Sequence, residues 1–304
     1  MHDGVGCRKR LRRLVPDNRP ALWLPLDDGL ISGPEDHLRD IRALLHRDIL
    51  EHVTAVLGFR GAIAAAEREL ADTPVVMNLS ASTTMAEHTH KAAVGSVRDA
   101  VFMGADAIAC HVNMTSPFEA DQLEMLGRRI EDAQPLGIPV VAFAYPRGRR
   151  PDGTDENYTD LRREEPEEFA TLVRHCVRVA VELGASVVKT IYTGSEQTFR
   201  TVVDSAMGVP ILIAGEKLAD EEEAIEKARQ AVLAGAHGVA YGRQIFARPD
   251  PLPFLRKLRS ALDDQWPGAG HLPPSAGHAT TINEVPSAIL SPNPGPASNP
   301  NSRW

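Results

Sequence analysis

The sequence feature that most limits the fold is a glycine junction that occurs three times along the chain. Met103-Gly104-Ala105-Asp106, Leu183-Gly184-Ala185-Ser186 and Ala234-Gly235-Ala236-His237 each end a helical pattern and begin an apolar run. A glycine at such a point supplies the left-handed backbone conformation that commonly ends an α-helix. The repetition indicates that one helix-to-strand unit is used several times.

Eight short apolar runs are the expected strands of these units, and amphipathic segments such as Pro166–Leu183 separate them. The runs are Ala21–Asp28, His52–Leu57, Pro74–Ser80, Ala105–Asn113, Ile138–Tyr145, Ser186–Tyr192, Val209–Gly215 and Gly238–Arg243. Most are unbroken, as expected for parallel strands that are buried on both faces. Eight units in ~245 residues match the size of a (β/α)8 TIM barrel. A doubly wound open sheet is the alternative architecture.

The two ends of the chain differ from this central barrel segment, which spans residues 20–265. Residues 1–19 contain the basic run Arg8-Lys9-Arg10-Leu11-Arg12-Arg13, which predicts the polar face of a short first helix. Residues 266–304 hold eight of the 23 prolines, together with Ser, Asn and Gly. Such a composition buries too little apolar surface to offset the entropy of ordering, so we expect a disordered tail.

Composition excludes several classes of protein. With 33 Lys and Arg against 41 Asp and Glu, the net charge is −8, and the single basic run is too short to neutralise a nucleic acid backbone. No apolar stretch approaches the ~20 residues of a membrane span, and no apolar segment follows the N-terminal charges as in a secretory signal. The three cysteines lie far apart, which favours a reducing, cytoplasmic location and argues against a disulfide scaffold.

The active site of a (β/α)8 barrel lies at the carboxyl ends of its strands. Of the six lysines, only Lys189 lies within an apolar strand run; the other five fall in segments typical of surface helices or loops. We expect burial to lower the pKa of Lys189 and so to supply a neutral amine, the nucleophile that forms a Schiff base with a ketone. The alternative is a lysine that forms a structural ion pair.

Other polar residues end the remaining strands. Tyr145 is a candidate general acid or base, or a packed tyrosine with a hydrogen-bonded tip, and Asp27 is a candidate proton carrier or an ordinary capping residue. His111 is expected to be a polar pocket residue, because no second His or Cys stands at metal-ligand spacing. The other candidate substrate- or phosphate-binding residues are Asp28, Ser80, Asn113, Arg147, Gly215, Gly242 and Arg243.

Five motifs together resemble one family, the DhnA-type class I aldolases. They are Pro25-Leu26-Asp27-Asp28-Gly29, Leu79-Ser80-Ala81-Ser82-Thr83, His111-Val112-Asn113, Tyr145-Pro146-Arg147-Gly148 and Val188-Lys189-Thr190-Ile191-Tyr192-Thr193-Gly194. The likeness extends from Arg10 to Leu258. It implies a homo-oligomeric barrel that needs no metal or other cofactor. It also implies that Lys189 is the Schiff-base lysine, Tyr145 and Asp27 are the proton-transfer groups, and Gly215, Gly242 and Arg243 hold a phosphate.

Three departures from the family pattern concern the substrate. Asp28 stands where the family has a histidine, and Glu216 replaces a glycine of the strand-seven phosphate loop. A carboxylate there repels a phosphate, unless Glu216 turns outward or Lys217 compensates for its charge. The loop after Tyr145 is also longer, with a charged stretch at Asp152–Glu168. Loops on this face select the acceptor, so these changes favour an acceptor outside glycolysis.

The resemblance therefore predicts an aldolase that joins dihydroxyacetone phosphate, or a related phosphoketose, to an aldehyde. Aspartate semialdehyde, in aromatic or secondary metabolism, is the expected acceptor. The alternatives are a fructose-1,6-bisphosphate aldolase, a 2-amino-3,7-dideoxyheptulosonate synthase and a coenzyme A-dependent thiolase of the same family. A phospho-ligand sensor without catalysis is the non-enzyme alternative, which the presence of Lys189, Tyr145 and Asp27 disfavours.

Overall fold

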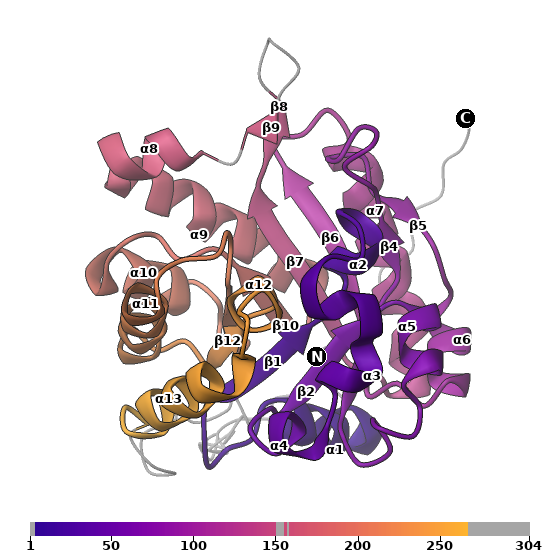
Figure 1. The fold of residues 1–304 in the computed structure, drawn as a ribbon. Helices are drawn as coiled ribbons and strands as arrows, with labels where there is room; N and C mark the ends of the chain where they lie inside the picture. The colour runs from indigo at the N-terminus through magenta and orange to yellow at the C-terminus, as the bar shows by residue number, and fades with distance from the viewer. Residues whose placement is uncertain (1–3, 150–154, 157, 267–304) are drawn as a thin grey trace, which may run out of the picture. The chain divides into compact units, whose positions relative to one another are not determined.

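The computed structural model describes residues 4–149, 155–156 and 158–266, and Figure 1 shows that its strands close into a barrel. The barrel strands are β1 (Ala21–Pro25), β2 (Ala55–Gly58), β3 (Val75–Asn78), β6 (Ala107–Met114), β7 (Val140–Pro146), β10 (Val187–Thr190), β11 (Ile211–Ala214) and β12 (Gly238–Ala240). Each pairs in parallel with the next along the chain, and β12 pairs with β1. The predicted (β/α)8 barrel is confirmed, and the open-sheet alternative is excluded.

Helices surround the barrel and follow its strands (Figure 1). The larger ones are α5 (Arg60–Ala65), α6 (Val97–Phe102), α7 (Glu119–Ala133), α9 (Pro166–Leu183), α10 (Glu196–Asp204), α11 (Glu221–Leu233) and α13 (Pro251–Asp263). Short helical turns are α2 (Asp28–Ile31), η1 (Asp36–Asp40), α3 (Ile41–Leu44), α4 (Arg47–Leu50), η2 (Gln134–Leu136) and α12 (Arg243–Phe246). Within the described ranges, no helix is both long and apolar enough to cross a bilayer.

The three glycine junctions behave as the sequence predicts. Gly104, Gly184 and Gly235 follow α6, α9 and α11, and their φ angles are 79°, 109° and 102°. Each junction leads directly into β6, β10 or β12. The left-handed conformation that only glycine adopts without strain therefore ends these helices and directs the chain back into the barrel.

Two small additions stand on the carboxyl-end face of the barrel. The antiparallel pair β4 (Ser80–Ala81) and β5 (Ala92–Ala93) follows β3 and encloses a loop at residues 82–91. After β7, the pair β8 (Gly148–Arg149) and β9 (Asp155–Glu156) leads into α8 (Thr159–Glu164). This second addition is the longer charged loop expected from the sequence, and part of it lies outside the described residues.

The opposite, amino-terminal end of the barrel is closed by α1 (Val5–Leu14), the predicted basic helix. Leu14 is fully buried against Trp23 of β1, whose indole Nε1 donates to the Leu14 carbonyl oxygen at 2.9 Å. The Thr54 hydroxyl donates to the same carbonyl oxygen at 3.0 Å. The basic side chain of Arg13 contacts Asp106 at the start of β6. The predicted disordered tail lies outside the described residues, apart from Trp266.

Candidate active site

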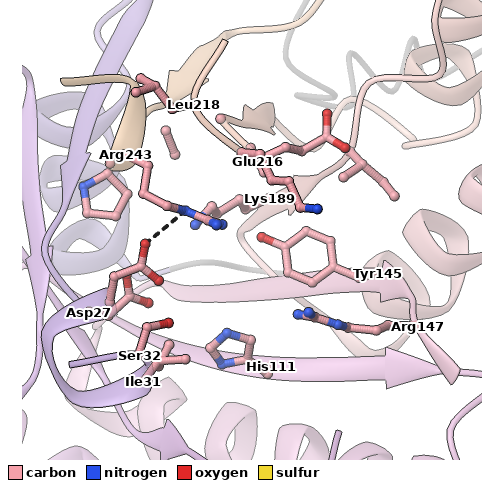
Figure 2. Close-up of a pocket in the computed structure, with 18 of the residues that line it drawn as sticks. Asp27, Ile31, Ser32, His111, Tyr145, Arg147, Lys189, Glu216, Leu218 and Arg243 are labelled. Atoms are coloured by element: carbon pink, nitrogen blue, oxygen red, sulfur yellow. Dashed lines mark ion pairs between the residues drawn. The ribbon is translucent and has the colours of Figure 1, made fainter. Parts of the chain in front are cut away.

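A cavity of about 560 Å³ opens at the carboxyl ends of the barrel strands, where the sequence predicts the site. Figure 2 shows Lys189, Tyr145, His111 and Arg147 pointing into it. Of the residues predicted from the sequence, those that line the cavity are Asp27, Asp28, His111, Tyr145, Arg147, Lys189, Gly215, Gly242 and Arg243. Ser80 and Asn113 do not line it.

The alternation of a β-strand explains why the catalytic candidates lie together. Side chains that face the barrel interior recur every second residue. Val187 and Phe143 belong to the apolar cluster that fills the barrel, and Lys189 and Tyr145 stand two residues farther along the same strands. Along β7 and β10 the interior therefore changes from a packed apolar layer to titratable groups within one inward-facing step.

Lys189 lies on the boundary between these two layers. Its side chain is only 8% exposed, and its Nζ lies 4.4 Å from the centre of the Phe143 ring. Burial disfavours the ammonium form, but Tyr145, Asp27 and Asp28 outweigh burial and raise the pKa of Lys189 above its ordinary value. The predicted lowering of this pKa is therefore wrong. The prediction counted only the cost of burial and omitted the acidic groups that the fold gathers around the amine.

Asp27 is held at the end of β1 by Asn78. The Asn78 Nδ2 donates to the Asp27 Oδ2 at 3.1 Å, and the Asp27 carboxyl is almost fully buried. Burial raises the pKa of Asp27, and Asp28 raises it further, while Lys189 opposes the change. Burial also raises the pKa of the Tyr145 hydroxyl, again opposed by Lys189. Asp27 is thus a carboxylate with an unusually high proton affinity beside a buried amine.

Ser80 positions other groups of the site from behind the cavity wall. Its hydroxyl lies 3.0 Å from His111 Nδ1 and accepts from the His111 backbone N–H at 2.8 Å. Its backbone N–H donates to the Asn78 side-chain oxygen at 3.1 Å. Burial, with added repulsion from Lys91 and Lys189, lowers the pKa of His111 well below its ordinary value, so this imidazole is neutral at physiological pH.

Asn113 has a different role, because it holds the loop at residues 82–91. Its Nδ2 donates to the Thr89 carbonyl oxygen at 3.0 Å, and the Gln122 Nε2 donates to the same oxygen at 2.7 Å. Gln122 in turn accepts from the Asn113 backbone N–H at 2.9 Å. All three residues are buried. Asn113 therefore fixes a loop that reaches the cavity rather than lining the cavity itself.

The predicted phosphate-binding residues meet at the ends of β11 and β12. The Arg243 Nε lies 3.0 Å from an Asp28 carboxylate oxygen, an ion pair marked in Figure 2. Asp28 thereby fixes Arg243 at the cavity edge. A Cβ on Gly242 would come within 2.8 Å of the Pro25 carbonyl oxygen, and one on Gly215 within 3.2 Å of Gln244. Packing therefore requires glycine at 242 independently of any ligand, whereas a side chain at 215 would have to displace Gln244 and Tyr241 by a few tenths of an ångström.

Glu216 stands where the family has a glycine. Its backbone has the left-handed conformation that favours glycine, with a φ of 55°. Its carboxylate accepts from Arg162 of α8 at 2.9 and 3.1 Å and is paired with Lys227 of α11. Although burial opposes it, these two cations lower the pKa of Glu216. The Glu216 charge is thus compensated by Arg162 and Lys227 rather than by Lys217, which was one of the two possibilities beside an outward-turned side chain.

The cavity also contains residues that the sequence analysis did not single out as site candidates. They are Pro25, Ile31, Ser32, Thr84, His88, Lys91, Thr159, Arg162 and Glu223, among others. Lys91 lies in a loop, as expected, but it is only 5% exposed. It belongs to a loop without strand or helix periodicity, so no pattern in the sequence points at the cavity. Arg162 lies in α8, within the long segment that follows β7. The length of that segment was the sequence feature that could have pointed to Arg162 as a site residue.

Known proteins resemble this chain in both sequence and fold. The profile of the DeoC/LacD family aldolases matches residues 21–248. The 2-amino-3,7-dideoxy-D-threo-hept-6-ulosonate synthase of Halobacterium salinarum is 38% identical over 261 residues, which cover 86% of this chain and 92% of that protein. The 2-amino-4,5-dihydroxy-6-oxo-7-(phosphonooxy)heptanoate synthase of Streptomyces griseus is 31% identical over 271 residues, covering 88% of this chain and 94% of that protein.

A solved structure shows the chemistry of such a barrel. An archaeal fructose-1,6-bisphosphate aldolase, with its catalytic lysine covalently bound to the carbinolamine intermediate, superposes with a TM-score of 0.73. It is 28% identical, and the alignment covers 84% of this chain and 99% of that one. The family profile spans the whole barrel, from β1 to the turn after α12. The chain is a class I aldolase and belongs to the DeoC/LacD aldolase family.

Proposed function

We propose that this aldolase joins dihydroxyacetone phosphate, or a closely related phosphoketose, to aspartate semialdehyde through an imine on Lys189. The observation that carries the proposal is the burial of Lys189 in one cavity with Tyr145 and Asp27. A buried amine between two proton-transfer groups has the parts that enamine chemistry requires. The arginine and glycines at the ends of β11 and β12 then receive the phosphate.

The pKa shifts favour a particular first step. Lys189 is an ammonium in the resting site because its pKa is raised, so it must lose a proton before it attacks the ketone. Asp27 accepts that proton, since burial gives it a raised pKa. The neutral amine then adds to the ketone carbonyl, and loss of water leaves an iminium on Lys189.

Tyr145 acts on the next carbon. Asp27 returns its proton to the hydroxyl that leaves as water and is again a carboxylate. The iminium acidifies the neighbouring C–H, and Tyr145 removes its proton to give the enamine while passing its own hydroxyl proton to Asp27. The enamine carbon attacks the aldehyde, the new alkoxide takes a proton, and water releases the product from Lys189. Tyr145 is partly exposed to the cavity, which lets its hydroxyl reach a bound substrate.

The choice of acceptor rests on the Streptomyces griseus relative. The name of its product places a phosphate on carbon 7, a ketone on carbon 6, and a hydroxyl on each of carbons 5 and 4. A retro-aldol cut between carbons 4 and 5 gives dihydroxyacetone phosphate and an aldehyde with an amino group and a carboxylate. That aldehyde is aspartate semialdehyde. We extend the same pair of substrates to this chain.

Fructose 1,6-bisphosphate cleavage is the second candidate, favoured by the archaeal aldolase of the same fold. The two candidates share the donor and differ only in the acceptor. Measuring condensation of dihydroxyacetone phosphate with aspartate semialdehyde and with glyceraldehyde 3-phosphate separates them. A higher kcat/KM for the phosphorylated aldehyde would replace the first candidate by the second.

Borohydride trapping tests the proposed chemistry directly. We expect dihydroxyacetone phosphate and borohydride to leave a reduced adduct on the peptide that contains Lys189, and the Lys189→Met variant to form none. Because Lys189 must be deprotonated and its pKa is raised, adduct formation should accelerate as the pH rises above neutrality. An adduct on another lysine, or none in the wild-type protein, would refute the role of Lys189.

A further inference from the structure

Glu216, which stands in place of a glycine of the family's phosphate loop, lines the cavity but has no part in the steps described above. It directly follows Gly215 at the end of β11. Figure 2 shows it at the same edge of the cavity as Arg243, opposite His111. A carboxylate at this edge opposes the binding of a phosphate by its charge. The groups that pair with Glu216 therefore decide whether the edge still attracts a phosphate.

The Glu216 carboxylate holds a guanidinium group, that of Arg162 in α8. Both Glu216 carboxylate oxygens accept from Arg162 Nη1, at 2.9 and 3.1 Å. The carbonyl oxygen of Tyr192, just after β10, accepts from the same nitrogen at 3.2 Å. The central carbon of the guanidinium lies 5.8 Å from the centre of the Phe169 ring of α9. These contacts hold Arg162 beside the ends of β10 and β11.

Arg162 keeps most of its hydrogen-bonding capacity for a ligand. A guanidinium carries five N–H donors on three nitrogens. Within the described part of the chain, Nη1 makes all the hydrogen bonds of this side chain, so Nε and Nη2 keep their donors. The side chain is 25% exposed and lines the cavity together with Gly215 and Glu216. Arg162 can therefore donate to a ligand at the edge where we expect the phosphate.

The charges around Glu216 favour an anion in spite of its own carboxylate. Arg162 and Lys227 both pair with Glu216, which leaves one positive charge in excess in this cluster. The two cations also lower the pKa of Glu216 although burial opposes them, so the carboxylate remains ionised at neutral pH and keeps hold of Arg162. Arg162 lines the cavity, and Lys227 does not. Arg162 is therefore the cation of this cluster that a cavity ligand can reach.

We propose that Arg162 binds the phosphate of the donor ketone and that Glu216 is the positioning residue that holds Arg162 in place. This inference rests on the proposed function and adds to it two residues that depart from the family's loop pattern. A guanidinium pairs with a phosphate through two parallel N–H donors, and Nε and Nη2 form one such edge. A side chain of α8 thus supplies a phosphate contact in this chain and selects phosphorylated ketones over uncharged ones.

Borohydride trapping on Lys189 with two ketones tests the phosphate contact. Dihydroxyacetone phosphate carries the phosphate, and dihydroxyacetone lacks it. At equal, subsaturating concentrations we expect the phosphorylated ketone to trap the wild-type protein faster. Arg162→Met should slow trapping by dihydroxyacetone phosphate about 10- to 100-fold, the loss expected for a hydrogen bond between charged groups, and leave dihydroxyacetone unchanged. Arg162→Lys keeps the charge without the planar pair of donors and should recover part of the loss.

Glu216→Gln tests the positioning role, because two explanations of Glu216 predict effects of opposite sign. If Glu216 positions Arg162, the variant slows trapping by dihydroxyacetone phosphate several-fold and leaves dihydroxyacetone unchanged. If Glu216 only repels the phosphate, the variant speeds trapping by the phosphorylated ketone. In the Arg162→Met protein the same substitution should cause no further loss, because no guanidinium remains to be held.

Arg178→Met is the matched control. Arg178 pairs with Glu182 within α9 and is not among the described residues that line the cavity. Both ketones should therefore trap this variant as they trap the wild-type protein. If Arg162→Met does not fold, Arg162→Gln provides the same measurement with the same expected loss.

The outcomes separate the inference from the proposed function. Equal rates for both ketones in the wild-type protein, unchanged trapping in Arg162→Met, or equal slowing of both ketones in that variant would overturn the phosphate contact and leave the proposed function standing. Faster trapping by dihydroxyacetone phosphate in Glu216→Gln, or a further loss from this substitution in the Arg162→Met protein, would overturn the positioning role. Absence of trapping on Lys189 in the wild-type protein would overturn both the inference and the proposed function.

Discussion

The two ends of the barrel are built from the same strands but contain different side chains. At the amino-terminal end, Trp23 and apolar neighbours fill the interior and α1 closes it. At the carboxyl end, the strands surround a cavity of about 560 Å³ with titratable groups. The change takes one inward-facing step, from Phe143 to Tyr145 and from Val187 to Lys189.

This contrast separates stability from chemistry along each strand. Apolar side chains contribute free energy of folding in proportion to the area they bury, whereas buried charges cost free energy unless they are paired. Substitutions at the carboxyl end should therefore lower activity with little loss of stability. Substitutions at the amino-terminal end should do the reverse.

The largest effect on activity, after replacement of the proposed nucleophile Lys189, is expected for Tyr145→Phe. It removes one hydroxyl from the cavity wall and leaves the ring. Loss of a general acid or base costs about 10²- to 10⁴-fold in turnover. The midpoint of thermal unfolding should hardly change, and the adduct on Lys189 should still form with borohydride. Turnover within a few-fold of wild type would show that another group, with Asp27 the first to examine, carries the proton.

The largest effect on stability is expected for Trp23→Ala. Trp23 is fully buried in the barrel interior, and its replacement leaves a cavity and removes one of the two donors to the Leu14 carbonyl oxygen. Such truncations cost about 3–5 kcal/mol of unfolding free energy. Denaturant unfolding measures the loss, while trapping on Lys189 in the folded fraction should persist. Trp23→Phe is the matched control, which loses the same indole hydrogen bond, and it should cost less because its ring fills most of the cavity. Loss of trapping in folded Trp23→Ala would show that the two ends are coupled.

The same contrast explains how far the sequence predicts the structure. Strands buried on both faces leave unbroken apolar runs, and helix ends at Gly104, Gly184 and Gly235 leave glycines, so local patterns were sufficient for the barrel. Lys189 was recognisable because a charge in an apolar run is costly.

Features that depend on contacts between distant segments were not predictable in this way. Lys91 lines the cavity from a loop that Asn113 of β6 and Gln122 of α7 hold at Thr89. The raised pKa of Lys189 depends on Tyr145 of β7 and on Asp27 and Asp28, which follow β1. The negative charge of Glu216 is compensated in part by Lys227, which lies eleven residues farther along the chain in α11. Each of these is set by the closed barrel rather than by any local pattern.

A smaller loss of unfolding free energy is expected for Glu216→Gln. This variant tests whether the carboxyl end of the barrel also contributes to stability. The Glu216 carboxylate joins α8 to α11 through Arg162 and Lys227, and its side chain is 24% exposed. Its loss should cost about 1–3 kcal/mol at neutral pH. Because the pKa of Glu216 is lowered in the folded state, this contribution is present above the ordinary carboxyl pKa and disappears as the pH falls through the folded value. A difference between variant and wild type that persists in strong acid would contradict the ion-pair explanation.

The smallest loss of unfolding free energy is expected for Arg13→Ala, at the amino-terminal end of the barrel. Arg13 pairs with the buried Asp106, whose other carboxylate oxygen accepts from the Val75 backbone N–H at 3.0 Å. Because the Arg13 side chain is 54% exposed, its loss should cost no more than about 1 kcal/mol, and less at high salt. Arg12→Ala, which breaks an exposed pair 3.8 Å long, is the control and should cost nothing measurable. Denaturant unfolding at low and high salt measures both. A larger cost for Arg13→Ala would mean that the ion pair, rather than the apolar contacts of Leu14, holds α1 on the barrel.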